Sequence, residues 1–169
     1  MKLKSLILEQ LDREEELTRR ALEQVPTGKN DWKPHPKSMP MGQLAHMVAN
    51  IPTWISMAVK QDELDIKSGQ ASGNGASRAM DSSEGLVQAL DKAVEEARKA
   101  VSKTTDKKLQ TPWRLLEGGN VVKEGPRYEF IMDNFKHLAH HRGQLTVYLR
   151  MNDATVPSIY GPSADDHRF

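Results

Sequence analysis

The stretch NFKHLAHHRGQL, residues 134–145, is the part of the chain around which the fold can be worked out. On an α-helix, His137 and His141 lie one turn apart and about 40° apart around the axis, so their imidazoles can converge on one point. Two histidines at positions i and i+4 form a natural pair of ligands for a transition metal. The third histidine of the cluster, His140, lies between them. The stretch therefore predicts a helix that carries a metal site, although solvated histidines on a surface helix would have the same spacing.

A polar stripe on this helix lies beside an apolar one. With His137 placed at 0°, polar and aromatic side chains fall within about 60° of it: Phe130, Asn134, His141, Gln144 and Tyr148. The apolar side chains centre on a neighbouring stripe: Ile131, Leu138, Leu145 and Leu149. This pattern is typical of a helix that packs into a core and also lines a pocket.

Three residues on the polar stripe are candidate catalytic residues: Asn134, Gln144 and Tyr148. Each could orient a substrate or a bound water, although a structural role is the simpler interpretation for each. Asp133 could accept a hydrogen bond from a ligand histidine and so orient its ring, without binding the metal itself. Tyr160 could close the pocket if the C-terminal tail folds back.

Composition restricts the kind of protein. With 169 residues, 37% hydrophobic and 28% charged, the chain fits one soluble globular domain, residues 1–169. A formal net charge of +1 gives no reason to expect nucleic acid or a membrane surface as partner. The chain has no cysteine, so disulfides, thiolate metal sites and cysteine nucleophiles are excluded.

The N-terminus becomes highly charged within a few residues, and no run approaches the length of a membrane span. No signal peptide is recognisable. The expected location is therefore cytoplasmic.

Helical periodicity predicts four amphipathic helices, over residues 2–24, 40–60, 81–103 and 126–151. Pro52 should kink the second helix. The polar segment 61–82 reads as a long loop, flexible over residues 68–77, and residues 115–122 could form a small hairpin around Gly-Gly-Asn. An irregular tail follows the last helix. The expected fold class is all-α, a four-helix bundle whose topology the periodicity leaves open.

Two histidines outside the last helix, His35 and His46, are further candidate ligands. His46 projects roughly opposite to Leu44, so the periodicity of the second helix alone predicts that it is exposed. His35 lies between two prolines in a connector, where a solvated histidine is the simpler interpretation. In the same connector, Trp32 is the expected anchor.

Three motifs together resemble the DinB family, including the branch related to bacillithiol-type and other small-thiol transferases. The first is WKPHPKS (32–38) leading into QLAHM (43–47), the second is HLAHHRGQL (137–145), and the third is PSIYGPSAD (157–165). They occur in the right order and cover nearly the whole chain.

The resemblance implies an up-down-down-up four-helix bundle, usually dimeric. It also implies a divalent metal bound by one histidine of the second helix and two of the last. Carried over by position, these ligands are His46, His137 and His141, with His140 as the competing ligand. This chain departs from similar sequences at Pro40, where a serine often caps the helix; Ser38 is the expected substitute.

Three neutral imidazole ligands do not reduce the double positive charge of a divalent metal, and they leave at least one coordination position open. Catalytic zinc sites have such an open position, whereas structural zinc sites are closed by four protein ligands. Zinc or nickel is the first candidate, with iron or manganese also compatible. The expected function is a metal-dependent enzyme that acts on a small molecule by thiol transfer or hydrolysis, with a low-molecular-weight thiol as a candidate substrate. The alternative is a noncatalytic metal- or small-molecule-binding helical dimer, and a third is a helical dimer with structural histidines.

Overall fold

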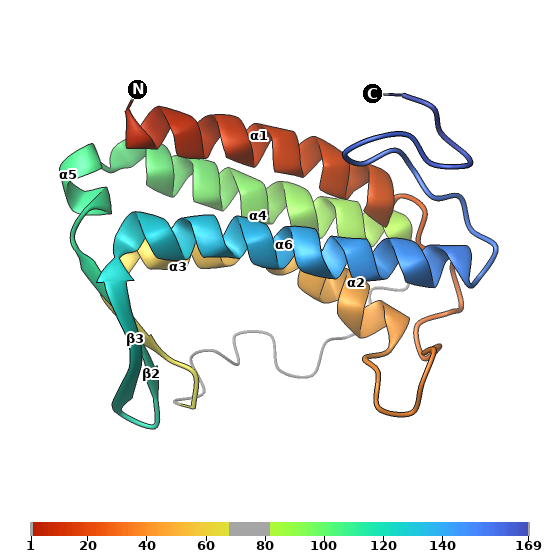
Figure 1. Cartoon of the computed structure of the whole chain (residues 1–169), viewed down its shortest axis with the longest axis horizontal. Helices are drawn as coiled ribbons and strands as arrows, with labels where there is room; N and C mark the ends of the chain where they lie inside the picture. The colour runs from red at the N-terminus through yellow and green to blue at the C-terminus, as the bar shows by residue number, and fades with distance from the viewer. Residues whose placement is uncertain (1, 68–81, 169) are drawn as a thin grey trace.

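The computed structural model describes residues 2–67 and 82–168. This part of the chain contains six helices and a small three-stranded sheet (Figure 1). The helices are α1 (Leu3–Leu22), α2 (Met41–Asn50), α3 (Pro52–Lys60), α4 (Ser83–Lys103), α5 (Asp106–Leu109) and α6 (Arg127–Arg150). The strands are β1 (Glu63–Asp65), β2 (Pro112–Glu117) and β3 (Asn120–Pro126).

Helices α1, α4 and α6 form a four-helix bundle with the consecutive helices α2 and α3, which together act as the fourth member. Figure 1 shows that α1 and α6 run in one direction, whereas α4 and the α2–α3 pair run in the other. This is the expected up-down-down-up order. Each helix buries one apolar stripe; in α4 the stripe consists of Leu86, Leu90, Val94, Ala97 and Val101. Ser82 caps α4, because its side chain accepts a hydrogen bond from the Gly85 N–H.

The expected kink in the second helix is confirmed. Helix α2 ends at Asn50 and α3 begins at Pro52, which occupies the first turn of the new helix, where its missing N–H costs no hydrogen bond. Because of this break, α2 and α3 are two separate helices where the sequence predicted one.

The expectation of an all-α fold is wrong, because the described chain also contains a sheet. Strands β2 and β3 form the expected hairpin but extend it in both directions, and Gly118 and Gly119 turn the chain with φ of +60° and +82°. Strand β1 pairs in parallel with β2 and lies in a segment that the sequence predicted as loop. A strand of three residues is too short to show the alternating pattern that predicts a strand, and its partner strand β2 is distant in the sequence. The expected flexible loop over residues 68–77 lies outside the described residues.

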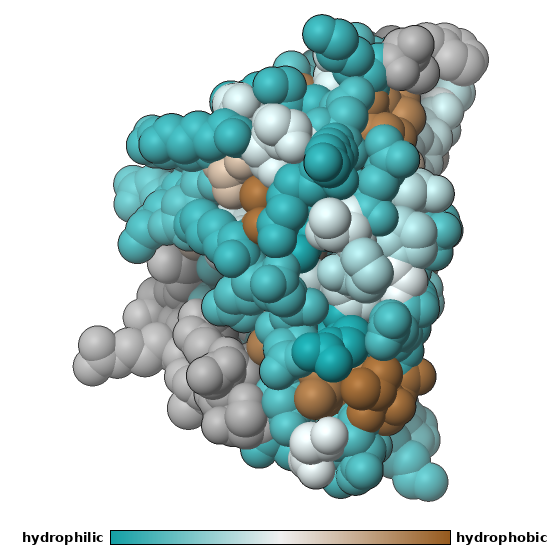
Figure 2. All heavy atoms as spheres, turned by 90° about the vertical axis from the view of Figure 1, so that its left-hand side faces the viewer, coloured by the Kyte–Doolittle hydropathy of each residue, from teal (hydrophilic) through white to brown (hydrophobic). Residues whose placement is uncertain are grey.

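Arg127 ties the sheet end of the bundle together. It is fully buried at the start of α6 and donates hydrogen bonds to the Ala58 and Gln61 carbonyls and to Asp62. These contacts fasten the first turn of α6 to the end of α3. The same end carries the hairpin, whose Val121 and Val122 are about half exposed. Figure 2 views this end and shows a largely hydrophilic face with an apolar patch in its lower part.

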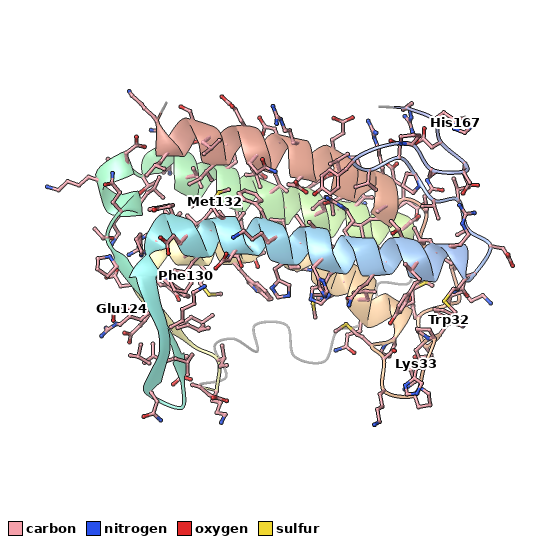
Figure 3. All side chains as sticks on the ribbon, viewed as in Figure 1. Trp32, Lys33, Glu124, Phe130, Met132 and His167 are labelled. Carbon is pink, nitrogen blue, oxygen red and sulfur yellow. The ribbon has the colours of Figure 1, made fainter. Side chains whose placement is uncertain are left out.

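The tail after α6 folds back towards α1 (Figure 1). Asp165 accepts a hydrogen bond from the Val156 N–H, and Asp166 accepts one from the Ser158 N–H. At this end of α6 the connector is anchored as expected, because Trp32 packs edge-on against Tyr148 at 5.3 Å. Figure 3 labels Trp32 at this end and Phe130 at the opposite end of α6. Among the described residues, no helix is long and apolar enough to cross a membrane.

Candidate metal centre and adjoining cavity

The His137 and His141 side chains meet on one face of α6. Their Nε2 atoms lie 2.7 Å apart, and the ring centroids are 4.5 Å apart. Two neutral imidazoles can approach this closely only when one Nε2 carries a hydrogen and the other offers a lone pair. The convergence expected from the i, i+4 spacing is therefore present.

Gln144 selects the tautomer of His141. Its Oε1 lies 2.8 Å from the His141 Nδ1, one helical turn away. A carboxamide oxygen can only accept, so the hydrogen of a neutral His141 lies on Nδ1 and its Nε2 keeps the lone pair. A ligand histidine needs this arrangement, in which an acceptor fixes one ring nitrogen and leaves the other free for the metal.

Partial burial favours the neutral form of two of the predicted ligands. Partial burial lowers the pKa of His137, and the neighbouring His141 and His140 lower it further. Partial burial also lowers the pKa of His46. Both imidazoles are therefore biased towards the uncharged form, which is the form that binds a metal.

His46 lies on α2, and its ring has no hydrogen-bond partner within the described chain. It is half-buried, where the periodicity of α2 predicted exposure. No group of three or more His, Asp or Glu side chains in residues 2–67 and 82–168 is close enough together to hold a metal ion. The structure thus brings together the pair His137–His141, and a ligand set that includes His46 stays a prediction.

A cavity of about 460 Å³ adjoins the histidine pair. His137 and Asn134 line it from α6, and Trp54 lines it from α3, with its ring centroid 5.2 Å from that of His137. The sheet closes the cavity on another side. The cavity has the size of a small-molecule pocket. Sequence analysis predicted a pocket beside this helix but did not identify its other walls.

The other predicted residues of α6 have different surroundings. Asn134 lines the cavity, and Gln144 holds His141. The Tyr148 hydroxyl donates to the Met39 carbonyl at 3.1 Å, so it fastens the connector. Asp133 forms ion pairs with Lys123 and Lys136, and these two bonds account for its lowered pKa; no histidine is among them.

The remaining candidate residues, His140, His35 and Tyr160, do not line the cavity. His140 is exposed, and its ring meets the edge of the His141 ring at 5.1 Å. His35 is exposed, and its Nδ1 accepts a hydrogen bond from the Lys37 N–H. Tyr160 folds back with the tail as expected, but its hydroxyl binds Arg142 and Glu14.

Sequence analysis missed the buried ion pair between Glu14 and Arg142. Their side chains are 4% and 1% exposed and meet at 2.7 Å. Thr18 accepts a further hydrogen bond from Arg142 at 3.0 Å. A signal was present, because Arg142 lies four residues after Leu138 and three before Leu145, on the apolar stripe. A charged residue on such a stripe indicates a buried, paired charge.

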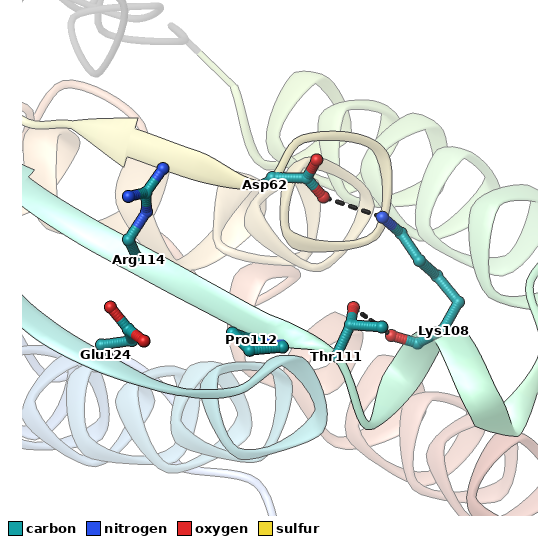
Figure 4. Close-up of a pocket in the computed structure, with 6 residues that line it drawn as sticks. All are labelled: Asp62, Lys108, Thr111, Pro112, Arg114 and Glu124. Carbon is teal, nitrogen blue, oxygen red and sulfur yellow. Dashed lines mark hydrogen bonds and ion pairs between the residues drawn. The ribbon is translucent and has the colours of Figure 1, made fainter.

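A second cavity, of about 380 Å³, lies at the sheet end of the molecule. Figure 4 shows its lining, in which Lys108 reaches across to Asp62 at 2.8 Å. Arg114, which also lines it, pairs with Glu63 at 2.5 Å. Because these charges are matched within the protein, this cavity makes a weaker candidate site than the one beside His137.

Comparisons with known proteins agree with the fold. A DinB-like protein from Bacillus cereus ATCC 10987 superposes with a TM-score of 0.68 at 24% identity, covering 91% of this chain and 95% of that one. The DinB-like protein YjoA from Bacillus subtilis gives a TM-score of 0.68 at 15% identity, with 89% and 94% coverage.

A local match to the uncharacterized protein YrdA of Bacillus subtilis (strain 168) has 39% identity over 62 residues. That match spans 34% of this chain and 37% of the relative's length. The model of the DinB family, in contrast, matches residues 1–168. The chain is therefore a member of the DinB family.

Proposed function

We propose that this protein is a metal-dependent enzyme that acts on a small molecule at a divalent metal bound by His46, His137 and His141. The reaction is thiol transfer or hydrolysis. The observation that carries the proposal is the meeting of the His137 and His141 Nε2 atoms at 2.7 Å beside a cavity large enough for a substrate.

The donor set suits a borderline metal such as zinc or nickel. Nitrogen atoms of two imidazoles bound to one tetrahedral zinc lie about 3.3 Å apart. The 2.7 Å contact therefore needs only a small outward rotation of the rings, with loss of the hydrogen that they share. His46 lies on α2, is half-buried and has no hydrogen-bond partner for its ring in the described chain. Its ring nitrogen is therefore available as a metal ligand.

A metal bound there would supply Lewis-acid activation of a water or of a substrate thiol. The protein would supply the surroundings. Gln144 holds His141 in the tautomer that leaves Nε2 free, and Asn134 offers an amide on the cavity wall. The substrate would enter through the cavity, which would bring its reacting end to His137.

The alternative is a metal- or small-molecule-binding bundle without catalysis. The exposed position of His140 and Gln144 favours neither proposal. We retain a homodimer and a cytoplasmic location as part of the proposal, with zinc or nickel ahead of iron or manganese.

Turnover distinguishes the two proposals. Metal-loaded protein is offered thiols with an electrophile, and separately a panel of esters and amides. The enzyme proposal expects turnover that His137→Ala abolishes and His35→Ala leaves unchanged, since His35 lies in the exposed connector. Stoichiometric metal binding without turnover in any assay would contradict the enzyme proposal and support the noncatalytic binding protein.

A further inference from the structure

The cavity beside His137 has walls of a distinct chemical kind. It lies between α3, the sheet and the first turns of α6, and apolar side chains contribute most of its lining. The contributors include Trp54, Met57, Leu64, Trp113, Leu115 and Phe130. Two of the rings already pack against each other, because the Trp113 and Phe130 centroids lie 4.5 Å apart.

The charges at this cavity cancel within the protein. Lys123 and Asp133 line it and pair at 2.6 Å, and both are partly exposed, at 49% and 40%. Lys123 also lies over the Phe130 ring at 4.9 Å. A ligand charge carried into the interior would lose its hydration and find no unpaired opposite charge. Phosphorylated or strongly ionic molecules are thus poor occupants.

Two neutral polar side chains of the lining, Asn134 and His137, follow Phe130 along α6, so they line the cavity on the side nearer the middle of that helix. His137 also contacts His141 through its Nε2, so a molecule that fills the cavity as far as His137 would place one end next to the histidine pair. Apolar walls that end in a few convergent polar groups are the usual design of a site that binds one part of a molecule and orients another.

We propose that the cavity binds a neutral, flat apolar group, such as an aromatic ring, of the small molecule that reacts at the histidine site. The assignment of the reacting end rests on the proposed function, whereas the assignment of the apolar group rests on the cavity alone. The occupant is a free small molecule, and the volume of about 460 Å³ accommodates one or two fused rings with a short side chain.

The test uses N-phenyl-1-naphthylamine, a neutral probe whose fluorescence rises in an apolar site, with full-length, metal-free protein. We expect saturable binding of one probe per chain. Leu115→Trp fills the cavity from β2, and Met57→Trp fills it from α3, so each should weaken binding by about tenfold or more. Leu8→Trp makes the same change at a partly buried leucine of α1 and should leave binding unchanged.

Circular dichroism of each variant shows whether it is folded, and the two filling variants approach from different elements, so one folded variant suffices. Absence of saturable binding, or binding that a folded filling variant leaves intact, would overturn the proposal.

A second arm tests the orientation. In displacement titrations, 2-phenylethanethiol should compete with the probe at concentrations at which 2-mercaptoethanol does not, and zinc should raise the affinity for the aromatic thiol. Equal competition by both thiols would overturn the apolar assignment. An aromatic preference that zinc does not affect, in protein shown to bind zinc, would overturn the orientation towards the histidines.

The two proposals fail separately. His46→Ala should lose zinc and keep the probe, because His46 does not line the cavity. Probe binding without any zinc binding would defeat the proposed metal function and leave the apolar site. Zinc binding without probe binding would overturn the apolar site and leave the proposed metal function standing.

Discussion

The carboxylate of Glu14 and the guanidinium of Arg142 form an ion pair at 2.7 Å inside the bundle, where both side chains are almost completely buried. The Tyr160 hydroxyl joins them, accepting from Arg142 at 2.6 Å and donating to Glu14 at 3.1 Å. The pair therefore links α1, α6 and the tail. Arg142 directly follows His141, so the same contacts fix the rotation of α6 that presents the histidines.

Breaking this pair from one side should destabilise the fold strongly. Arg142→Met leaves the Glu14 carboxylate buried without its partner, and we expect a loss of about 3–5 kcal/mol in the free energy of unfolding. The double variant Glu14→Leu/Arg142→Met should cost less than the sum of the single changes, because it leaves no unpaired charge. Urea denaturation measures all three. Strict additivity would contradict the coupling.

Two helical glycines should respond oppositely to alanine. A Cβ on Gly42 would lie 2.9 Å from the Asn30 Oδ1 and 3.0 Å from its Cβ, so Gly42→Ala must displace either the Asn30 side chain or the start of α2. We expect a loss of about 1–3 kcal/mol in stability. At Gly143 nothing lies within 4 Å, and alanine should stabilise by about 0.5–1 kcal/mol through helix propensity. Thermal unfolding compares the two, and similar effects would contradict this account.

The tail should loosen in acid. Arg150 and the Val156 N–H lower the pKa of Asp165, and Arg168 and the Ser158 N–H lower the pKa of Asp166. Since both folded values lie below the ordinary 3.8, their stabilisation is complete above that pH and is lost as the pH falls towards the folded values. Amide hydrogen exchange at Val156 and Ser158, corrected for intrinsic rates, should accelerate below about pH 4. Unchanged protection at pH 2.5–3 would contradict this account.

Gln144 should influence metal affinity without being a ligand. Replacing it by leucine removes the acceptor that holds the His141 Nδ1 hydrogen, and we expect zinc affinity to fall by about 10–100-fold. Gln88→Leu makes the same change at an exposed position of α4 and serves as the control. Isothermal titration with zinc measures both. Equal affinities for the two variants would show that Gln144 has no such role.

Local periodicity predicted much of this fold. The helical spacing of residues 134–145 correctly brought His137 and His141 together, and Pro52 marked a real break in the second helix. Strand β1 could not be predicted, because its three residues are held by a parallel pairing with β2 across the chain. The cavity walls depend on that same pairing. Glu14 shows the opposite case, since its place between Leu11 and Thr18 on a buried stripe was a local signal that sequence analysis overlooked.

His46 marks the limit of sequence analysis at the site. Its assignment as a ligand came from the family resemblance, while the periodicity of α2 predicted an exposed side chain. The structure shows it half-buried, because the packing of α2 against α6 depends on contacts between helices and not on the pattern within one.

The most direct test is the metal content of untagged protein after incubation with zinc or nickel and removal of free metal. The account predicts about one ion per chain in the wild type, with loss of the ion in His46→Ala and in His141→Ala, and its retention in His140→Ala. No bound ion in the wild type, or full retention in His46→Ala, would contradict the three-histidine site.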